Sequence, residues 1–324
     1  MRKRRTLLGS TALGAGLLAA LLTVPGGGAM AQSPAQPSAR TSAQRPASVA
    51  VQSPDIPSAN VMAHARQFQT IASANGGNRA HGRPGFRASA DYVKAKLDAA
   101  GFQTTLQPFT YQGATGYNVI ADWPQGDPDH VVFLGAHLDS VAAGPGIDDN
   151  ASGTSAVLET ALAVARADAK PTKRLRFGWW GAEEAGMVGS RNYVSTLSAA
   201  DRSKIDAYLN FDMVGAKNST TWGIYTDSTT LGATFSEFFQ SKGIPTKRIN
   251  PAGRSDHASF KNAGIQVSGI AADDDPCYHT RCDDINNIAE SVLGTSTNAI
   301  AYAAWKLAGI PGLAVPARPY RHAA

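Results

Sequence analysis

The sequence predicts an α/β fold: one globular domain with a mixed, mostly parallel β-sheet and helices on both faces. Three apolar segments rich in β-branched and aromatic residues, 131–138, 175–181 and 207–213, are typical of buried strands. Helical patterns separate the later strands, whereas short turns join the earlier ones. Helical connections favour parallel pairing and short turns favour antiparallel pairing, so we expect a hairpin side and a parallel centre.

The expected helices and strands begin at Ile56, where the composition becomes globular. Two helices open the domain, because Val61, Phe68 and Ile71 share one helical face and a second helical pattern ends at Gly101. Further helices are expected over 151–167, 190–197, 231–242 and about 289–307. The expected strands are 103–111, 117–123, 131–138, 175–181, 207–213, 222–226 and 266–271.

Residues 1–31 are predicted to be a secretory signal peptide. They have a basic start, an apolar run from Leu7 to Val24 and the cleavage pattern Ala29-Met30-Ala31. No later stretch approaches the roughly 20 consecutive apolar residues that cross a membrane as a helix. We therefore expect a secreted, extracellular protein without a membrane anchor after signal cleavage.

The rest of the chain divides into a linker, a domain and a tail. Residues 32–54 are rich in Pro, Ser, Ala and Gln, which predicts a disordered linker or pro-segment. The folded domain is expected over 55–310, and 311–324 form a C-terminal tail. Residues 1–54 carry six basic and no acidic residues, and subtracting these six charges from the formal net charge of +5 leaves −1. This balance excludes nucleic acid and anionic membrane as partners, and a monomer is the default expectation.

The chain has two cysteines, Cys277 and Cys282. In an exported protein, a pair this close in sequence most simply forms one local disulfide bond. The resulting small loop would fix Tyr278 and His279 in one orientation, which favours a functional role for this histidine over a purely structural one.

Polar residues follow the first buried strand at its C-terminal end, where open α/β sheets carry their chemistry. His137 and Asp139 come first, and a turn at Gly144-Pro145-Gly146 leads to Asp149. A histidine and acids at a helix start suit a hard or borderline cation. The alternative is that these acids merely cap the following helix.

Two further strands end in the same way. Glu183 and Glu184 follow Trp179-Trp180, and Asp212 lies inside an apolar run. Neighbouring side chains of an extended backbone point to opposite sides, so one glutamate can bind metal while the other handles protons. An acidic helix start is the alternative for this pair. A buried aspartate needs a cation or several hydrogen bonds to remain ionised, so capping does not account for Asp212.

Together these segments supply five nitrogen and oxygen donors: His137, Asp149, Glu184, Asp212 and His279. Five donors exceed the needs of one tetrahedral catalytic zinc ion but suit two zinc ions that share a bridging carboxylate. The sequence therefore predicts a site for two Zn²⁺.

The chain resembles the secreted bacterial di-zinc leucyl aminopeptidases, a co-catalytic zinc metallopeptidase family, most closely the streptomycete type. The resemblance runs from Pro54 to about Lys306 and is carried, in order, by GAHLDS, GPGIDDNASG, WWGAEE, LNFDMVG, GRSDHA and CYH. It implies that His137 and Asp212 bind one zinc, that Glu184 and His279 bind the other, and that Asp149 bridges them. It also implies Glu183 as general base, Tyr278 as donor to the developing oxyanion, and Asp139 as the group orienting His137.

The same resemblance implies a metallo-aminopeptidase that removes leucine-like, large apolar N-terminal residues from peptides or proteins by a water activated between two zinc ions. Met213 and Arg254 would contribute to substrate binding. This chain has only IAADDDP between Gly269 and Cys277, where the relatives have a longer aromatic loop, so its pocket is expected to be more open. The resemblance further implies a cis peptide bond between Asp149 and Asn150.

Calcium binding is expected to be weak or absent. Relatives bind calcium through positions matching Asp55 and Ile56 together with two acids of the last helix. Those two acids correspond to Gly294 and Asn298 here, so one carboxylate remains where calcium sites usually gather several.

Three alternatives remain open. A di-zinc carboxypeptidase or deacylase of related fold would need groups that bind a substrate carboxylate, and usually has a lid domain that is not visible in the sequence. A glutaminyl-cyclase-like transferase binds one zinc, which leaves His137 and Asp212 unexplained. A non-catalytic ectodomain would be expected to have lost ligands, and all five are present.

Overall fold

A computed structural model describes residues 52–312 of the chain. The expected signal peptide, nearly all of the expected linker and nearly all of the C-terminal tail lie outside the described residues. The described part contains the whole α/β domain expected from the sequence.

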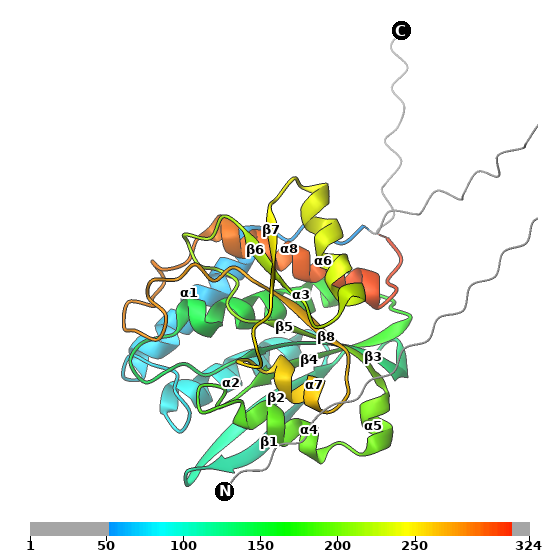
Figure 1. The fold of residues 1–324 in the computed structure, drawn as a ribbon. Coiled ribbons are helices and arrows are strands. Elements are labelled where there is room, and N and C mark those ends of the chain that lie inside the picture. The colour runs from blue at the N-terminus through cyan, green and yellow to red at the C-terminus, as the bar shows by residue number, and fades with distance from the viewer. Residues whose placement is uncertain (1–51, 313–324) are drawn as a thin grey trace, which may run out of the picture. The chain divides into compact units, whose positions relative to one another are not determined.

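One sheet of eight strands forms the centre of the domain (Figure 1). In spatial order the strands are β1 (Gln103–Tyr111), β2 (Ala114–Asp122), β4 (Lys173–Trp180), β3 (Asp127–His137), β5 (Ile205–Phe211), β8 (Val267–Ala271), β6 (Trp222–Tyr225) and β7 (Thr246–Ile249). β3 pairs in parallel with β4 and β5, and β5 pairs in parallel with β8. β1 and β2 form an antiparallel hairpin, and β2 runs antiparallel to β4. The predicted hairpin side and parallel centre are confirmed.

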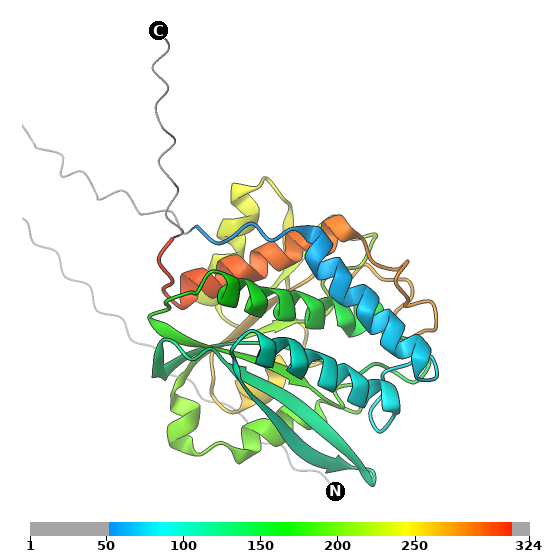
Figure 2. The same cartoon turned by 180° about the vertical axis from the view of Figure 1, so that it is seen from behind.

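Helices cover both faces of the sheet, as Figures 1 and 2 show from opposite sides. One face carries α1 (Ser58–Ala74), α2 (Pro84–Ala99), α3 (Gly153–Arg166) and α8 (Glu290–Leu307), with α6 (Thr229–Ser241) packed against α8. The other carries α4 (Val188–Thr196), α5 (Ala199–Ser203) and α7 (His257–Asn262).

The buried side chains form two hydrophobic clusters. The larger cluster lies between the sheet and α1, α2, α3 and α8. The smaller one lies beneath α4 and α7, and half of its ten buried residues are aromatic. In it Tyr208 is stacked on Phe260 at 3.7 Å between ring centroids, and Phe133 is edge-on to both. Each fully buried aromatic or branched side chain contributes roughly 1.5 to 3 kcal/mol, so these clusters hold the strands in register.

Three short segments were not expected from the sequence: β7, α5 and α7, of four, five and six residues. Such lengths carry too few side chains to establish a period. The helix expected from 151 begins at Gly153, because residues Ile147–Ser152 form a π-type turn with non-helical torsion angles at Asp149 and Asn150.

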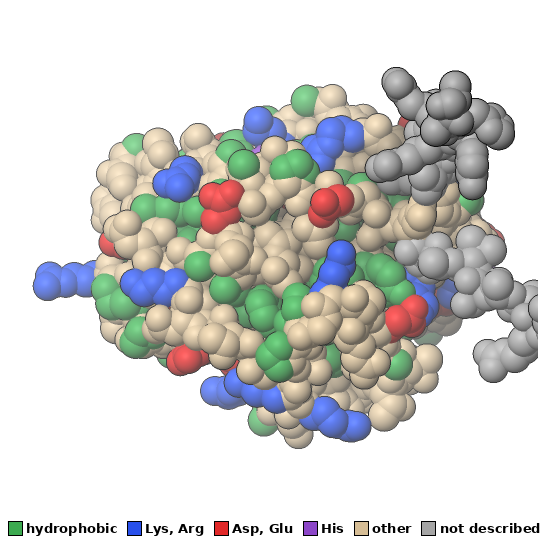
Figure 3. Space-filling view, turned by 90° about the horizontal axis from the view of Figure 1, so that it is seen from above, with side chains coloured by type: hydrophobic (Ala, Val, Ile, Leu, Met, Phe, Trp, Pro, Cys, Tyr) green, Lys and Arg blue, Asp and Glu red, His purple; other side chains and the backbone are tan. Residues whose placement is uncertain are grey.

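No helix in residues 52–312 has the length and apolar character that a membrane-crossing helix needs. On the face seen in Figure 3, lysine and arginine side chains do not form one continuous stripe, and acidic and uncharged side chains lie among them. This distribution agrees with the near-neutral charge of the domain.

Candidate metal centre

The predicted site residues meet at the C-terminal edge of the parallel strands. His137 is the last residue of β3, Asp212 directly follows β5, and Glu183 and Glu184 follow β4. Parallel strands end at the same edge of a sheet, so side chains from three separate segments are brought together there. Each of these four residues lies at the end of a strand or within four residues after it.

Asp149 reaches this edge from the turn between β3 and α3. The peptide bond between Asp149 and Asn150 is cis, as predicted. Asp283 holds the turn, because its two carboxylate oxygens accept hydrogen bonds from the backbone N–H groups of Asp148 at 2.7 Å and Asp149 at 2.9 Å. At Gly153 a Cβ atom would lie 2.1 Å from the Phe211 carbonyl oxygen, so glycine is needed where α3 approaches β5.

The two carboxylate oxygens of Asp149 face two different histidines. Oδ1 lies 3.1 Å from Nε2 of His137, and Oδ2 lies 3.1 Å from Nε2 of His279. His137 Nε2 is also 3.4 Å from Asp212 Oδ1, and His279 Nε2 is 3.0 Å from Glu184 Oε2. The five predicted donors thus form two groups of three that share Asp149.

Asp139 connects β3 to the glutamate pair. Its carboxylate accepts hydrogen bonds from the backbone N–H groups of Glu183 at 3.0 Å and Glu184 at 3.3 Å. His137 Nδ1 lies 3.2 Å from the Asp139 main-chain carbonyl and 3.7 Å from its carboxylate. Asp139 is therefore next to His137, as expected, but its carboxylate mainly fixes the backbone of the two glutamates.

Asp212 is held by a residue that the sequence interpretation did not single out. The Ser255 hydroxyl donates to Asp212 Oδ2 at 2.5 Å and accepts from the Asn210 amide at 2.8 Å. Ser255 belongs to the GRSDHA motif, which was the available signal. The Asp212–Met213 peptide bond is also cis, which was not expected.

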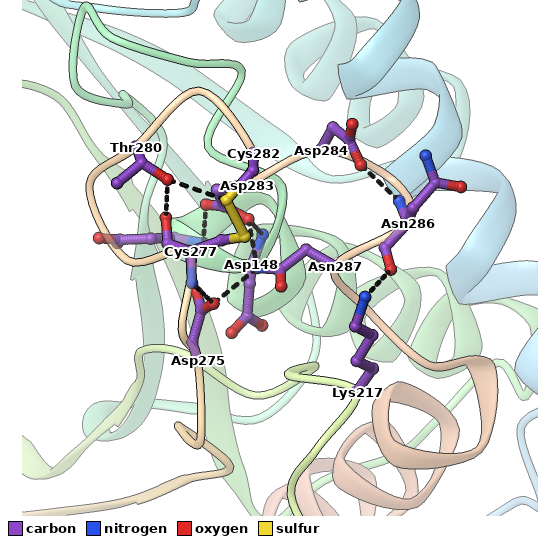
Figure 4. Close-up of a disulfide and its surroundings, with 11 residues drawn as sticks. Asp148, Lys217, Asp275, Cys277, Thr280, Cys282, Asp283, Asp284, Asn286 and Asn287 are labelled. Carbon is purple, nitrogen blue, oxygen red and sulfur yellow. Dashed lines mark hydrogen bonds between the residues drawn. A yellow bond between two sulfur atoms is a disulfide. The ribbon is translucent and has the colours of Figure 1, made fainter.

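The disulfide bond between Cys277 and Cys282 is present, as predicted, and closes the loop that carries His279 (Figure 4). Asp275 accepts hydrogen bonds from the Cys277 N–H at 2.6 Å and the Asn287 amide at 2.8 Å. Inside the loop, the Tyr278 ring stacks on the His279 imidazole at 3.8 Å between centroids. Tyr278 is half exposed and borders the cleft described below.

Arg79 holds the segment between His137 and Asp149. It is fully buried, and its guanidinium donates hydrogen bonds to the carbonyl oxygens of Leu138, Pro145 and Gly146. Its backbone N–H donates to the Ser140 hydroxyl at 2.9 Å. Nothing in the local sequence NRAHG marked this arginine, since its partners are backbone groups about 60 residues away.

The site is strongly acidic when no cation is counted. Burial and the neighbouring carboxylates of Asp256 and Asp212 raise the pKa of Glu183 to about 10, although His137 opposes the shift. Burial and Asp149 raise the pKa of Glu184 to about 8. Burial opposes ionisation of Asp149 too, but hydrogen bonds from His137 and His279 lower its pKa to about 2. Such a set of crowded carboxylates is stabilised by added positive charge.

A cleft of about 510 Å³ opens onto the two donor groups. Asp149, Glu183, Asp212 and His279 are among the residues that line it. Apolar atoms of Met213, Tyr225, Ile249 and Ala271 line the wall, and Arg254, Asp273, Asp275 and Tyr278 are also at its border. Both residues expected to bind substrate, Met213 and Arg254, therefore border the cleft.

The donor set fits a borderline cation. Ligand atoms of His137, Asp149 and Glu184 lie within 4.8 Å of one another, and the combination of imidazole and carboxylate is typical of zinc. The opposite directions of the two Asp149 oxygens fit a carboxylate shared between two ions.

Two features bear on calcium. The Asn298 amide donates to the Ile56 carbonyl at 3.0 Å, and its oxygen accepts from the Ile56 N–H at 2.9 Å. At Gly294, a Cβ atom would lie 2.7 Å from the Ser58 Cβ. Weak or absent calcium binding remains a prediction.

Comparisons with known proteins place the chain among peptidases. Residues 118–304 match the model of peptidase family M28. The chain is 54% identical over 280 residues to leupeptin-inactivating enzyme 1 of Streptomyces exfoliatus, covering 80% of this chain and 64% of that protein. The chain thus spans slightly less than two thirds of that relative.

Solved structures agree on the fold. A zinc aminopeptidase from Bacillus subtilis is 28% identical, with a TM-score of 0.57 over 62% of this chain and 51% of that one. A glutaminyl cyclase from Bacteroides thetaiotaomicron is 18% identical, with a TM-score of 0.66 over 78% of this chain and 98% of that one. The similarity to the cyclase concerns the fold alone. The reaction therefore has to be inferred from the arrangement of the donor residues and not from the fold.

Proposed function

The chain belongs to peptidase family M28, and on this premise we propose that it is a zinc-dependent aminopeptidase that removes large apolar, leucine-like residues from the N-termini of peptides. The observation that carries the proposal is the position of Asp149 between two donor groups. A single-zinc transferase has no use for a second group of three donors, so this arrangement favours a two-ion hydrolase.

His137, Asp149 and Asp212 would hold one zinc ion, and Asp149, Glu184 and His279 the other. When bound, the two ions would supply a water of lowered pKa and a Lewis acid for the scissile carbonyl. Arg79, Asp139, Ser255 and Asp283 contribute by holding these donors or their backbone in place.

Glu183 is the proposed general base. Its carboxylate lies 4.0 Å from His137 Nε2 and borders the cleft, which leaves it free to contact a water molecule there. The positive charge of the two bound ions would keep the Glu183 carboxylate ionised at neutral pH. It would then accept a proton as the water oxygen adds to the carbonyl carbon, and return this proton to the amine when the C–N bond breaks. The Tyr278 hydroxyl donates a hydrogen bond to the carbonyl oxygen as negative charge develops on it.

The substrate's first residue would occupy the apolar part of the cleft. Met213, Tyr225, Ile249 and Ala271 offer contacts to a large apolar side chain. Glu183 and Asp212 would hold the free α-amine, which restricts the enzyme to unblocked N-termini. We also propose export by the signal peptide of residues 1–31, and action as a monomer.

The proposal is tested by metal content together with a substrate series. We expect two zinc ions per chain, hydrolysis of leucine p-nitroanilide, and no hydrolysis of its N-acetylated form. A deacylase or carboxypeptidase would cleave blocked substrates, and a cyclase would release ammonia from N-terminal glutamine with one zinc bound. Either result would replace the proposed function.

A further inference from the structure

A second groove, of about 590 Å³, is lined by residues of α4, α5 and α7 and shares Asn250 with the metal cleft. Figure 1 shows these three helices on one face of the sheet. We call this second groove the basic groove, because Arg191, Arg202 and Lys261 line it and no aspartate or glutamate does. Arg191 comes from α4, Arg202 from α5 and Lys261 from α7. Three separate helices therefore present cations to one hollow.

Two of these cations are available for a ligand. Lys261 pairs with Asp227 at 2.7 Å. Within residues 52–312, neither Arg191 nor Arg202 forms an ion pair with a carboxylate, although Lys204 beside Arg202 pairs with both Asp129 and Asp201. A guanidinium group has five N–H donors arranged to bind a carboxylate through two hydrogen bonds.

The basic groove adjoins the metal cleft. Both are lined by Asn250, and the segment 250–254 lies between them, with Gly253 on the groove side and Arg254 on the cleft side. The two hollows differ in charge, since the cleft is bordered by acids that include Asp273 and Asp275. An acidic cleft next to a basic groove matches a peptide that is positive at its N-terminus and negative further along.

We propose that the basic groove binds carboxylates of the peptide substrate a few residues downstream of the bond that is cleaved. This inference rests on the proposed aminopeptidase function. A substrate with its α-amine in the metal cleft would extend past Asn250 into the groove, where Arg191 and Arg202 bind either an acidic side chain or the C-terminal carboxylate. Peptides with such a carboxylate are therefore the preferred substrates.

The test compares kcat/KM for four substrates at low ionic strength. Two are amidated pentapeptides, Leu-Ala-Glu-Glu-Ala and Leu-Ala-Gln-Gln-Ala, and the third is the latter with a free C-terminus. The fourth, leucine p-nitroanilide, is too short to reach the groove. The protein variants are Arg191→Ala/Arg202→Ala and, as matched control, Arg66→Ala, which removes an exposed arginine from α1 on the other face of the sheet.

We expect the double variant to lower kcat/KM for the Glu-Glu peptide by roughly 3- to 20-fold, mainly through KM, since each of the two exposed ion pairs lost is worth up to about fivefold. The neutral amide and leucine p-nitroanilide should change less than twofold, and Arg66→Ala should resemble wild type. A loss for the free-acid peptide as well would identify the C-terminus as a second source of the carboxylate. The preference should weaken at 0.5 M salt.

Charge reversal gives a result that a damaged fold would not produce. Arg191→Glu/Arg202→Glu should come to prefer amidated Leu-Ala-Lys-Lys-Ala over the Glu-Glu peptide. Equal kcat/KM for acidic and neutral peptides in wild type, or an equal loss for all four substrates in the double variant, would overturn the proposal. If wild type does not cleave leucine p-nitroanilide, the aminopeptidase function is wrong and the substrate role of the groove fails with it.

Discussion

Glu183 and Glu184 are neighbours in sequence but have different surroundings. Asp139 holds both backbone N–H groups, so the pair is fixed at its main chain. The Glu184 carboxylate lies 3.0 Å from His279 Nε2 within a donor group, whereas the Glu183 carboxylate comes no closer than 4.0 Å to His137 Nε2. Asp139 thus fixes the backbone of both residues, while their carboxylates have different contacts. This difference supports Glu184 as a metal ligand and Glu183 as the general base.

Replacing each glutamate in turn should separate these jobs. Glu183→Ala should retain both zinc ions and the wild-type fold but lose kcat by about 10² to 10⁴-fold, the usual contribution of a general base. Glu184→Ala should lose or weaken one zinc ion. Metal analysis beside steady-state kinetics on leucine p-nitroanilide measures both effects. Loss of zinc from Glu183→Ala with full retention in Glu184→Ala would reverse the assignment.

His137, Glu184 and Asp212 were predictable from the sequence because each is a polar residue at or shortly after the end of an apolar strand, as with His137 after 131–136. Asp149 follows a glycine-rich turn and His279 lies between two cysteines, which made these two donors predictable as well. Arg79, Ser255 and Asp283 were not, because they act on backbone or side-chain groups far away in sequence. Arg79, for example, bonds to Gly146 over 67 positions. Only the three-dimensional fold brings such partners together. The motif GRSDHA contains Ser255 but does not indicate its contact with Asp212, and no local pattern marks Arg79 or Asp283.

The segment 138–146 connects two proposed metal ligands, His137 and Asp149, and is held by a buried side chain from outside it. Of the lysines and arginines in residues 52–312, only Arg79 is buried, and it donates to three carbonyls of this segment. Burial lowers its pKa to about 10, which still leaves it charged at neutral pH. It therefore supplies both hydrogen bonds and positive charge beside Asp139 and Asp283.

Arg79→Met should lower the free energy of unfolding by about 3 to 5 kcal/mol, because three carbonyls lose their donor and the nearby acids lose a buried cation. Arg79→Lys should lose less, since lysine keeps the charge but not the fork of donors. Urea unfolding and zinc affinity by chelator competition measure these losses. Arg87→Met, which removes an exposed pair with Asp91, is the control and should change stability by less than about 1 kcal/mol. A similarly small change for Arg79→Met would contradict the role given to Arg79.

Helices α1 and α3 are joined by the buried carboxylate of Glu159. It accepts hydrogen bonds from Asn60 at 3.0 Å and Arg166 at 2.6 Å, and lies 3.0 Å from His64 Nε2, whose other nitrogen contacts the Tyr92 hydroxyl on α2. Burial opposes its ionisation, but the contacts with His64, Asn60 and Arg166 prevail and lower the pKa of Glu159. The carboxylate is therefore more stable as an anion in the folded chain.

Because the folded pKa is lowered, this stabilisation is complete above the unfolded value of about 4.5 and is lost as pH falls through the folded value. Glu159→Gln should unfold more easily than wild type by about 1 to 3 kcal/mol at pH 7, and the difference should shrink below pH 4.5. Urea unfolding of metal-free protein between pH 7 and pH 3 tests this. A difference that stays constant or grows on acidification would show that the anion is not the stabilising form. Asp91→Asn, on the exposed surface of α2, serves as control.

The long strands and helices were predictable because each repeats its pattern several times, as in 131–138 and α8. β7, α5 and α7 were not predicted because they are too short to show a repeating pattern. Their conformation is determined by contacts with neighbouring elements rather than by their own sequence. The turn at Ile147–Ser152 was misassigned in part to the following helix, because its residues are compatible with a helix start while the contacts of Asp283 fix another backbone.

Most of the buried acidic side chains of the described residues lie at one edge of the sheet. Eight carboxylates lie buried or half-buried around the donor groups: Asp139, Asp148, Asp149, Glu183, Glu184, Asp212, Asp256 and Asp283. Arg79 interacts electrostatically with Asp139 and Asp283, and His137 and His279 each lie 3.1 Å from Asp149. Without metal, this edge must be stabilised by protonation and by the rest of the fold, so bound cations should contribute substantially to the stability of the entire domain.

Zinc should therefore raise the melting temperature of the metal-free protein. A ligand present at 1,000 times its Kd stabilises by about 4 kcal/mol, which corresponds to a shift of roughly 10 °C for a domain of this size. Scanning calorimetry of chelator-treated protein titrated with Zn²⁺ measures the shift, and Mg²⁺, which prefers oxygen ligands and retains water, should produce little of it.

Glu184→Ala and His279→Ala, which disturb only one donor group, should keep part of the shift, because the group of His137, Asp149 and Asp212 remains. A full wild-type shift in both variants would mean that one ion accounts for all of the stabilisation, and the absence of any shift in wild type would mean that this edge does not bind zinc.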